Sequence, residues 1–134
     1  MIAILAAGLA ALAALLHVYI FVMESVRWRR PGVWRRFGVA DQASADTIAP
    51  MAYNQGFYNL FLAIGVALGL ALLWATGADA AGSRAVAGRA LVLFALGSMV
   101  AAAVVLTTGG RRYLRPALIQ GTLPAIGFVL FLLG

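Results

Sequence analysis

The sequence predicts an all-α integral membrane protein, built as a bundle of four helices that cross the membrane. Three observations lead to this fold class. The chain of 134 residues is 64% hydrophobic and only 10% charged, whereas soluble domains are about 25% charged. Four apolar stretches reach or approach the roughly 20 residues that a transmembrane helix needs. The basic residues are all Arg, and they gather at the ends of these stretches.

The four predicted spans are residues 2–23, 51–75, 86–108 and 116–133, which together make residues 1–134 a single transmembrane domain. The first stretch is predicted to be a span and not a signal peptide, because its basic cluster follows it. Residues 24–50 form the longest loop, predicted as polar coil or a short helix. In it Asp46 or Thr47 is predicted to cap the second helix, with Pro50 in the first turn. Residues 75–84 predict a short turn.

The distribution of Arg predicts the orientation of the chain. Five Arg lie between the first two spans and three lie between the last two, against two, Arg84 and Arg89, at the junction of the second and third. The positive-inside rule therefore makes residues 24–50 a cytoplasmic loop and puts both termini on the outer, periplasmic side of a bacterial inner membrane. The same rule explains the formal charge of +6 without a nucleic-acid partner.

The loop after the first span combines Arg with aromatic residues in the stretch RWRRPGVWRRF. This mixture is typical of an interfacial anchor, with aromatic rings at the level of the lipid head groups and Arg beside the phosphates. Specific recognition of a lipid or an anionic ligand is the alternative that the pattern leaves open.

Polar side chains inside the spans gather in the half nearest the Arg-rich loops. The first helix carries His17 and, just beyond the predicted span, Glu24, seven residues apart and so on one helix face, and the fourth span carries Gln120. The second span opens with Asn54, Gln55, Tyr58 and Asn59. Polar groups at membrane depth normally face the bundle interior or a wet cavity. We therefore expect one intramembrane pocket that faces the cytoplasm.

Roles within this pocket follow from side-chain chemistry. Candidate catalytic residues are His17, Glu24 and Tyr58, since imidazole and carboxyl groups transfer protons. Candidate ligand-binding residues are Trp28, Asn54, Gln55, Asn59 and Gln120. Structural alternatives stay open: Glu24 paired with Arg27, Arg30 or Trp28, His17 hydrogen-bonded to Asn59, and the amides holding helices together.

The predicted function is the binding or processing of a small amphipathic or lipid-like molecule, and the sequence does not decide whether the protein is an enzyme. A non-catalytic assembly or regulatory subunit is the alternative, and transport of a proton or small solute is a weaker one. No metal or other cofactor is predicted, because one His, one Glu and no Cys make a poor ligand set. Membrane lipids are the expected partners beside the ligand, and a homo-oligomer stays open.

Three motifs carry a resemblance to a known family. They are His17-x-x-x-Phe21-x-x-Glu24-x-x-x-Trp28, the run Asn54-Gln55-Gly56-Phe57-Tyr58-Asn59, and Gln120-x-x-x-Pro124. With them the chain resembles a family of small bacterial four-helix membrane proteins catalogued as a domain of unknown function, and the resemblance implies this size, topology and signature. In architecture alone the chain is similar to the membrane-associated eicosanoid and glutathione metabolism enzymes, whose second-helix Arg and Glu it lacks.

Overall fold

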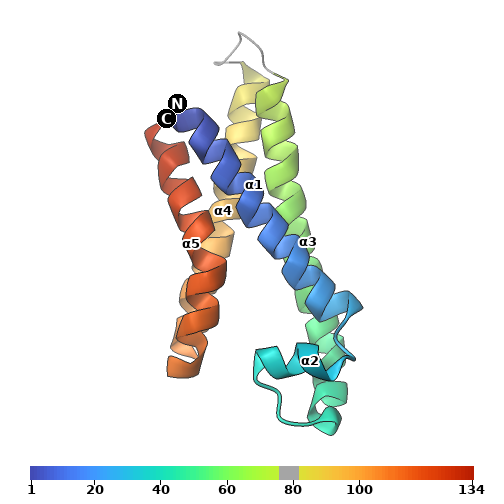
Figure 1. Cartoon of the computed structure of the whole chain (residues 1–134). Helices are drawn as coiled ribbons and strands as arrows, with labels where there is room; N and C mark the ends of the chain where they lie inside the picture. The colour runs from blue at the N-terminus through green and yellow to red at the C-terminus, as the bar shows by residue number, and fades with distance from the viewer. Residues whose placement is uncertain (76–81) are drawn as a thin grey trace. The chain divides into compact units, whose positions relative to one another are not determined.

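The computed structural model describes residues 1–75 and 82–134, and in this part of the chain every regular element is helical. The elements are drawn in Figure 1, and the short connection predicted at residues 75–84 lies mostly outside the described residues. In chain order they are α1 (Ile2–Phe21), η1 (Val22–Val26), α2 (Pro31–Trp34), η2 (Arg35–Phe37), α3 (Gln42–Trp74), α4 (Ser83–Thr108), η3 (Arg111–Tyr113) and α5 (Leu114–Leu133).

Four of the described helical stretches are long and apolar enough to cross a membrane. They are Ile2–Val26, Gln42–Trp74, Ser83–Thr108 and Arg111–Leu133. The all-α fold class with four candidate spans is therefore confirmed, and the chain is a multi-pass membrane protein by the length and composition of its helices. The side of the termini, the inner membrane and the single domain stay predictions.

Helix α3 begins nine residues before the predicted span, at Gln42 rather than at residue 51. The predicted caps Asp46 and Thr47 are wrong. The backbone N–H of Ser44 donates to Asp41 Oδ1 at 2.7 Å, so Asp41 caps the helix, and this hydrogen bond lowers the pKa of the Asp41 carboxyl. Thr47 instead donates to the carbonyl of Ala43 within the helix. Pro50 consequently lies in the helix interior, and because it has no N–H it leaves one intrahelical hydrogen bond unmade.

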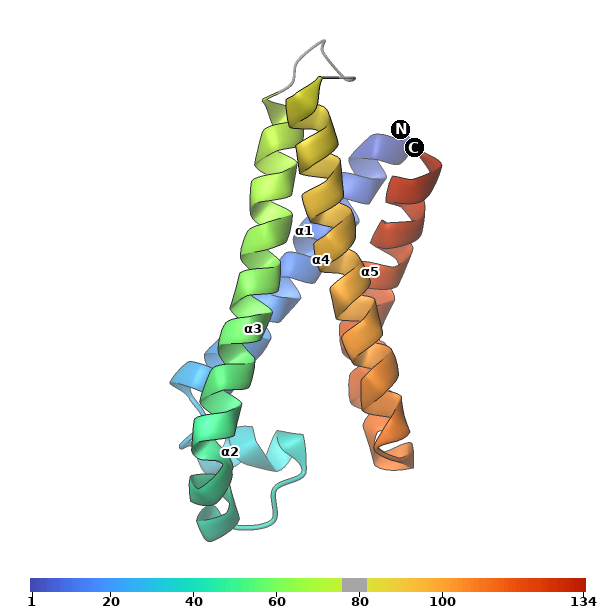
Figure 2. The ribbon, with the colours of Figure 1, turned by 180° about the vertical axis from the view of Figure 1, so that it is seen from behind.

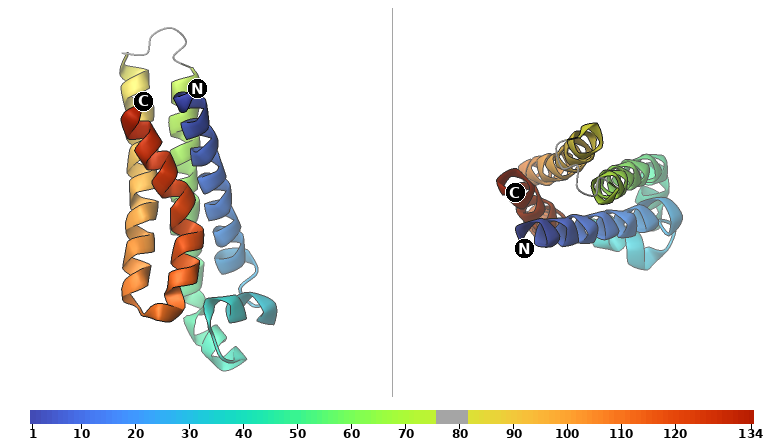
Figure 3. Two further views of the ribbon diagram at one scale, coloured as in Figure 1. Left: turned by 60° about the vertical axis from the view of Figure 1, so that its left-hand side comes forward. Right: turned by 90° about the horizontal axis from the view of Figure 1, so that it is seen from above.

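The described chain forms two compact units. Unit 1 comprises Met1–Leu16 and Leu62–Gly134, and its core is made of small and branched residues. The core residues are Ala6, Ala10, Ala13, Val66, Val92, Ala95, Leu96, Met99 and Phe131. Figure 2 shows α4 running beside α5, and the two chain termini lie together at one end of this unit (Figure 3). Arg89 of α4 donates to the backbone carbonyl of Phe131 at 2.5 Å, which satisfies a free carbonyl near the end of α5.

Close helix packing in unit 1 depends on glycine. The carbonyl of Gly88 in α4 would lie 2.7 Å from a Cβ added to Gly69 in α3, so no larger residue fits there without a backbone shift. Gly65, one turn earlier in α3, does not require such a close approach, because a Cβ there would meet Ala95 at an ordinary 3.5 Å.

Unit 2 comprises His17–Phe61: the end of α1, the connection through α2 and η2, and the first half of α3. It has its own core of Trp28, Trp34, Ala45 and Ala52. The indole N–H of Trp28 donates to the backbone carbonyl of Ala45 at 2.9 Å, and its ring lies 5.4 Å from that of Phe37. The predicted interfacial anchor is thus a folded element held against α3, which is the part of the molecule where the candidate site lies.

Candidate functional site

A change of helix type places the key carboxylate. Helix α1 ends at Phe21 and continues as the π-helical turn η1, in which the N–H of Arg27 donates to the carbonyl of Val22 five residues earlier at 2.8 Å. The wider turn alters the direction in which the following side chains leave the backbone. Such turns occur often at functional sites. Glu24 lies in the middle of η1 and is buried, with 9% of its surface exposed.

Gly56 allows η1 to pack directly against α3. A Cβ at this position would overlap the hydroxyl of Ser25 and lie 3.1 Å from both the Cβ of Glu24 and the backbone N of Ser25. The Ser25 hydroxyl donates to the carbonyl of Tyr53 at 2.8 Å. One turn further along α3, Phe57 packs edge-on against Phe21 with ring centroids 5.1 Å apart. These contacts fix the position of Glu24 along the axis of α3.

Asn59 is the hydrogen-bond partner of Glu24. Its side-chain N donates to Glu24 Oε2 at 3.0 Å and to the carbonyl of Gln55, one turn earlier in α3, at 3.1 Å. Pairing of Glu24 with Arg27, Arg30 or Trp28, one of the open alternatives, is not what the structure shows. No hydrogen bond from residues 1–75 and 82–134 reaches the other oxygen, Glu24 Oε1. Among these residues the only fully buried side-chain N or O atom without a partner is Trp34 Nε1. Glu24 Oε1 is therefore not fully buried, and part of its surface is accessible.

A pocket of about 520 Å³ opens beside Glu24 and lies entirely within unit 2. This volume is in the range of small-molecule sites. One wall consists of residues 24–30, from η1 and the turn after it. The other wall consists of Asp46, Ala49, Pro50 and Tyr53 of α3. These four recur at offsets of three, four and seven residues, so they share one helix face.

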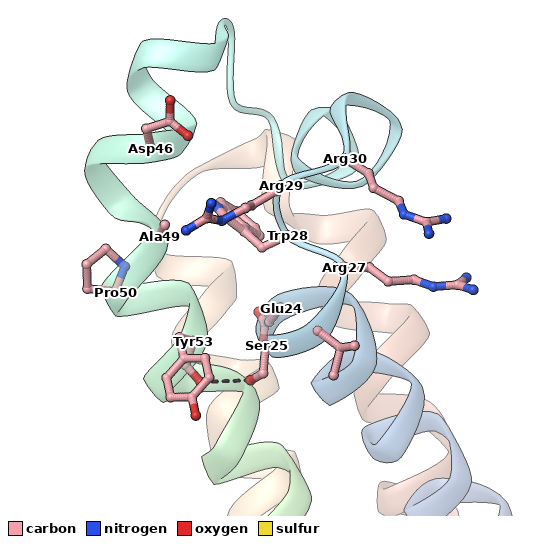
Figure 4. Close-up of a pocket in the computed structure, with 11 residues that line it drawn as sticks. Glu24, Ser25, Arg27, Trp28, Arg29, Arg30, Asp46, Ala49, Pro50 and Tyr53 are labelled. Atoms are coloured by element: carbon pink, nitrogen blue, oxygen red, sulfur yellow. Dashed lines mark hydrogen bonds between the residues drawn. The ribbon is translucent and has the colours of Figure 1, made fainter.

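The charged side chains around the pocket differ in direction (Figure 4). Arg29 is directed toward α3, whereas Arg27 and Arg30 extend away from α3. Glu24 and Ser25 lie on the η1 side, with Tyr53 opposite Ser25. The pocket therefore presents a carboxylate, a guanidinium and aromatic surface together, which is the lining expected for a ligand with a polar end.

The structure brings only part of the predicted site together. Glu24 and Trp28 line the pocket, and Asn59 holds Glu24. His17 is buried, with 2% of its surface exposed, but is not part of the lining. Gln120 is half-buried in α5, within unit 1.

The other predicted residues of α3 lie on its outer surface. Asn54, Gln55 and Tyr58 are exposed, and 55% of the Tyr58 surface is accessible. These three side chains are not part of the pocket lining, and their roles stay predictions. The backbone carbonyl of Gln55 helps to orient Asn59.

Sequence reasoning missed Ser25, Arg29, Asp46 and Tyr53 as parts of the site. A signal for the α3 residues was present, since Asp46, Ala49, Pro50 and Tyr53 have helical spacing once the helix is begun at Gln42. The described residues contain no group of three His, Cys, Asp or Glu side chains that could hold a metal ion.

Comparison with known proteins gives the family of the chain but no activity. A family model described as a protein of unknown function (DUF1304) matches residues 11–132. The chain therefore belongs to this family, which agrees with the resemblance found in the sequence motifs. Neither a curated protein nor a solved structure matches the chain.

Proposed function

We propose that this DUF1304 protein binds a small amphipathic or lipid-like molecule, with the polar end of that molecule in the pocket beside Glu24. The proposal places the site at the cytoplasmic face of a bacterial inner membrane. It treats the protein as a binding protein, because Glu24 alone of the three candidate catalytic residues lines the pocket.

The observation that carries the proposal is the environment of Glu24. Its carboxylate is buried at the end of a candidate membrane span, and its one hydrogen-bond partner among the described side chains is a neutral amide. Burying a charge is costly unless it is well paired. A helix contact needs only the small residues already present at Gly56 and Ala52. A carboxylate kept there with one accessible oxygen is better explained by a ligand.

The position of the pocket favours an amphipathic ligand. Its lining runs from Glu24, within the first candidate span, to Arg29 and Arg30, beyond that span. A molecule with its polar end in the pocket and its apolar part in lipid bridges these two environments. The Arg-rich stretch after the first span supports a cytoplasmic location of the pocket, by the positive-inside rule.

Co-purification tests the proposal. The protein is extracted in a mild non-ionic detergent and analysed by native mass spectrometry, with Ala49→Phe as the variant that fills the pocket. We expect one defined amphiphile at a fixed ratio on the wild type and its loss from the variant. Ala43→Phe, on the same helix but exposed and outside the lining, is the matched control and should retain the molecule.

Two results would contradict the proposal. One is that the wild type carries only the lipids of the bulk membrane in their bulk proportions. The other is that Ala49→Phe retains the same molecule as the wild type. Thermal unfolding in the same detergent establishes that both variants are folded. In either case the role of the protein would be sought in assembly with other membrane proteins.

A further inference from the structure

The pocket lining carries charge of both signs, and the two signs are not paired with each other. Glu24 is bonded to Asn59, and Asp46 accepts a hydrogen bond from Gln42. Arg29 reaches toward the same space from the turn after η1 (Figure 4). No ion pair joins these side chains within the described part of the chain. The lining therefore offers an acceptor and a donor to different parts of one ligand.

Glu24 selects for a cationic or hydrogen-donating group. A carboxylate accepts at both oxygens, and Asn59 occupies Oε2 only. A ligand ammonium at the other oxygen would stabilise the charged form of this buried carboxyl group more than a neutral amide does. Trp28 and Tyr53 also line the pocket, and an aromatic ring that presents its face to a cation attracts it.

Arg29 selects for an anionic group. Its planar guanidinium matches a phosphate or carboxylate through two parallel hydrogen bonds. Arg27 and Arg30 lie on the same wall and add positive charge at the mouth of the pocket, although both extend away from α3. Glu24 would repel a ligand that carries only an anionic group. The three Arg would repel a ligand that carries only a cationic group.

We infer that the ligand has a zwitterionic head group, with a primary ammonium directed to Glu24 and a phosphate directed to Arg29. This inference rests on the proposed function, since it assigns the chemistry of the same pocket. Two kinds of molecule carry a phosphate and an ammonium together, a membrane lipid and a soluble phosphoamine, and both present the same groups to the lining.

A titration in neutral detergent micelles tests the inference. The probes are three single-chain amphiphiles of equal chain length: lysophosphatidylethanolamine, lysophosphatidic acid and a primary alkyl amine. Bound probe is counted by native mass spectrometry. We expect the wild type to bind lysophosphatidylethanolamine at least about tenfold more tightly than the other two, the difference that one charge-assisted hydrogen bond supplies.

Two variants assign the charges. Glu24→Gln keeps an acceptor for Asn59 and should remove the preference for the zwitterion over lysophosphatidic acid. Arg29→Gln should remove the preference over the amine, and because Arg29 is exposed, this variant is expected to fold. Asp41→Asn and Arg111→Gln make the same chemical changes at exposed positions outside the lining and should behave as the wild type.

The outcomes separate the inference from the proposed function. Equal or tighter binding of lysophosphatidic acid or of the amine overturns the zwitterion while leaving an amphiphile pocket. Saturable binding of none of the three probes overturns both. Soluble phosphoethanolamine added as a competitor identifies the source. Displacement of the bound lipid indicates that the head group is sufficient, and retention indicates that the chain is also needed, as for a membrane lipid.

Discussion

Asn59 and Asn54 are the same residue type on the same helix, yet their surroundings differ. Asn59 is half-buried and bonded to the carboxylate of Glu24, whereas Asn54 is exposed. A side-chain hydrogen bond between membrane helices contributes about 1–2 kcal/mol in model systems. Here it also keeps the buried carboxylate from being left without any partner.

Replacement of these two residues should therefore have unequal effects. We expect Asn59→Leu to lower the free energy of unfolding by about 1–2 kcal/mol, because it removes the partner of Glu24. We expect Asn54→Leu to change it by less than about 0.5 kcal/mol, as at most surface positions. Unfolding of both variants in mixed detergent micelles measures the difference, and equal losses would mean that the Glu24–Asn59 bond does not stabilise unit 2.

The helices show how far hydropathy determines this structure. All four candidate spans were predicted, because a long apolar run has no other stable conformation in lipid. The start of α3 was predicted at the wrong residue, because Asp46, Thr47 and Pro50 together are typical of a helix start. Asp41, which does cap the helix, stands five residues earlier in a polar stretch where hydropathy gives no signal.

The pocket could not be predicted from helical spacing alone. Its wall depends on the π turn at Val22–Val26, which breaks the regular spacing that placed His17 and Glu24 on one face. It depends also on the approach of Ser25 to Gly56, a contact between residues about 30 positions apart. Glu24 and Asn59 were found because polar residues within or at the end of a span are informative by type alone.

Two glycines at contrasting places test the packing of unit 1. Gly69→Ala should lower the free energy of unfolding by about 1–3 kcal/mol, because its Cβ would meet the backbone of Gly88 and the side chain of Val92. Gly8→Ala should be neutral or slightly stabilising, because nothing lies within 4 Å of the added carbon. Thermal unfolding in one detergent compares the two. A neutral Gly69→Ala would contradict the close approach of α3 and α4.

For the whole molecule, the orientation in the membrane decides whether the pocket meets the cytoplasm. The chain has no Cys, so single cysteines can be introduced as labels. In cells with a permeabilised outer membrane, an impermeant maleimide should label Ser83→Cys but reach Gln42→Cys only after the inner membrane is lysed. Both positions are exposed. The reverse pattern would put the pocket on the periplasmic side, contrary to the distribution of Arg among the predicted loops.

The most direct measurement locates a bound amphiphile on the chain. An amphiphile with a photoreactive group in its head is added to the protein in detergent, illuminated, and the adducts are mapped by peptide mass spectrometry. A ligand held in the pocket predicts adducts confined to residues 24–30 and to the α3 segment from Asp46 to Tyr53, lost in Ala49→Phe. Adducts spread over the exposed apolar faces of α1, α4 and α5 would show that the amphiphile only coats the apolar surface of the protein. That result would contradict a specific site.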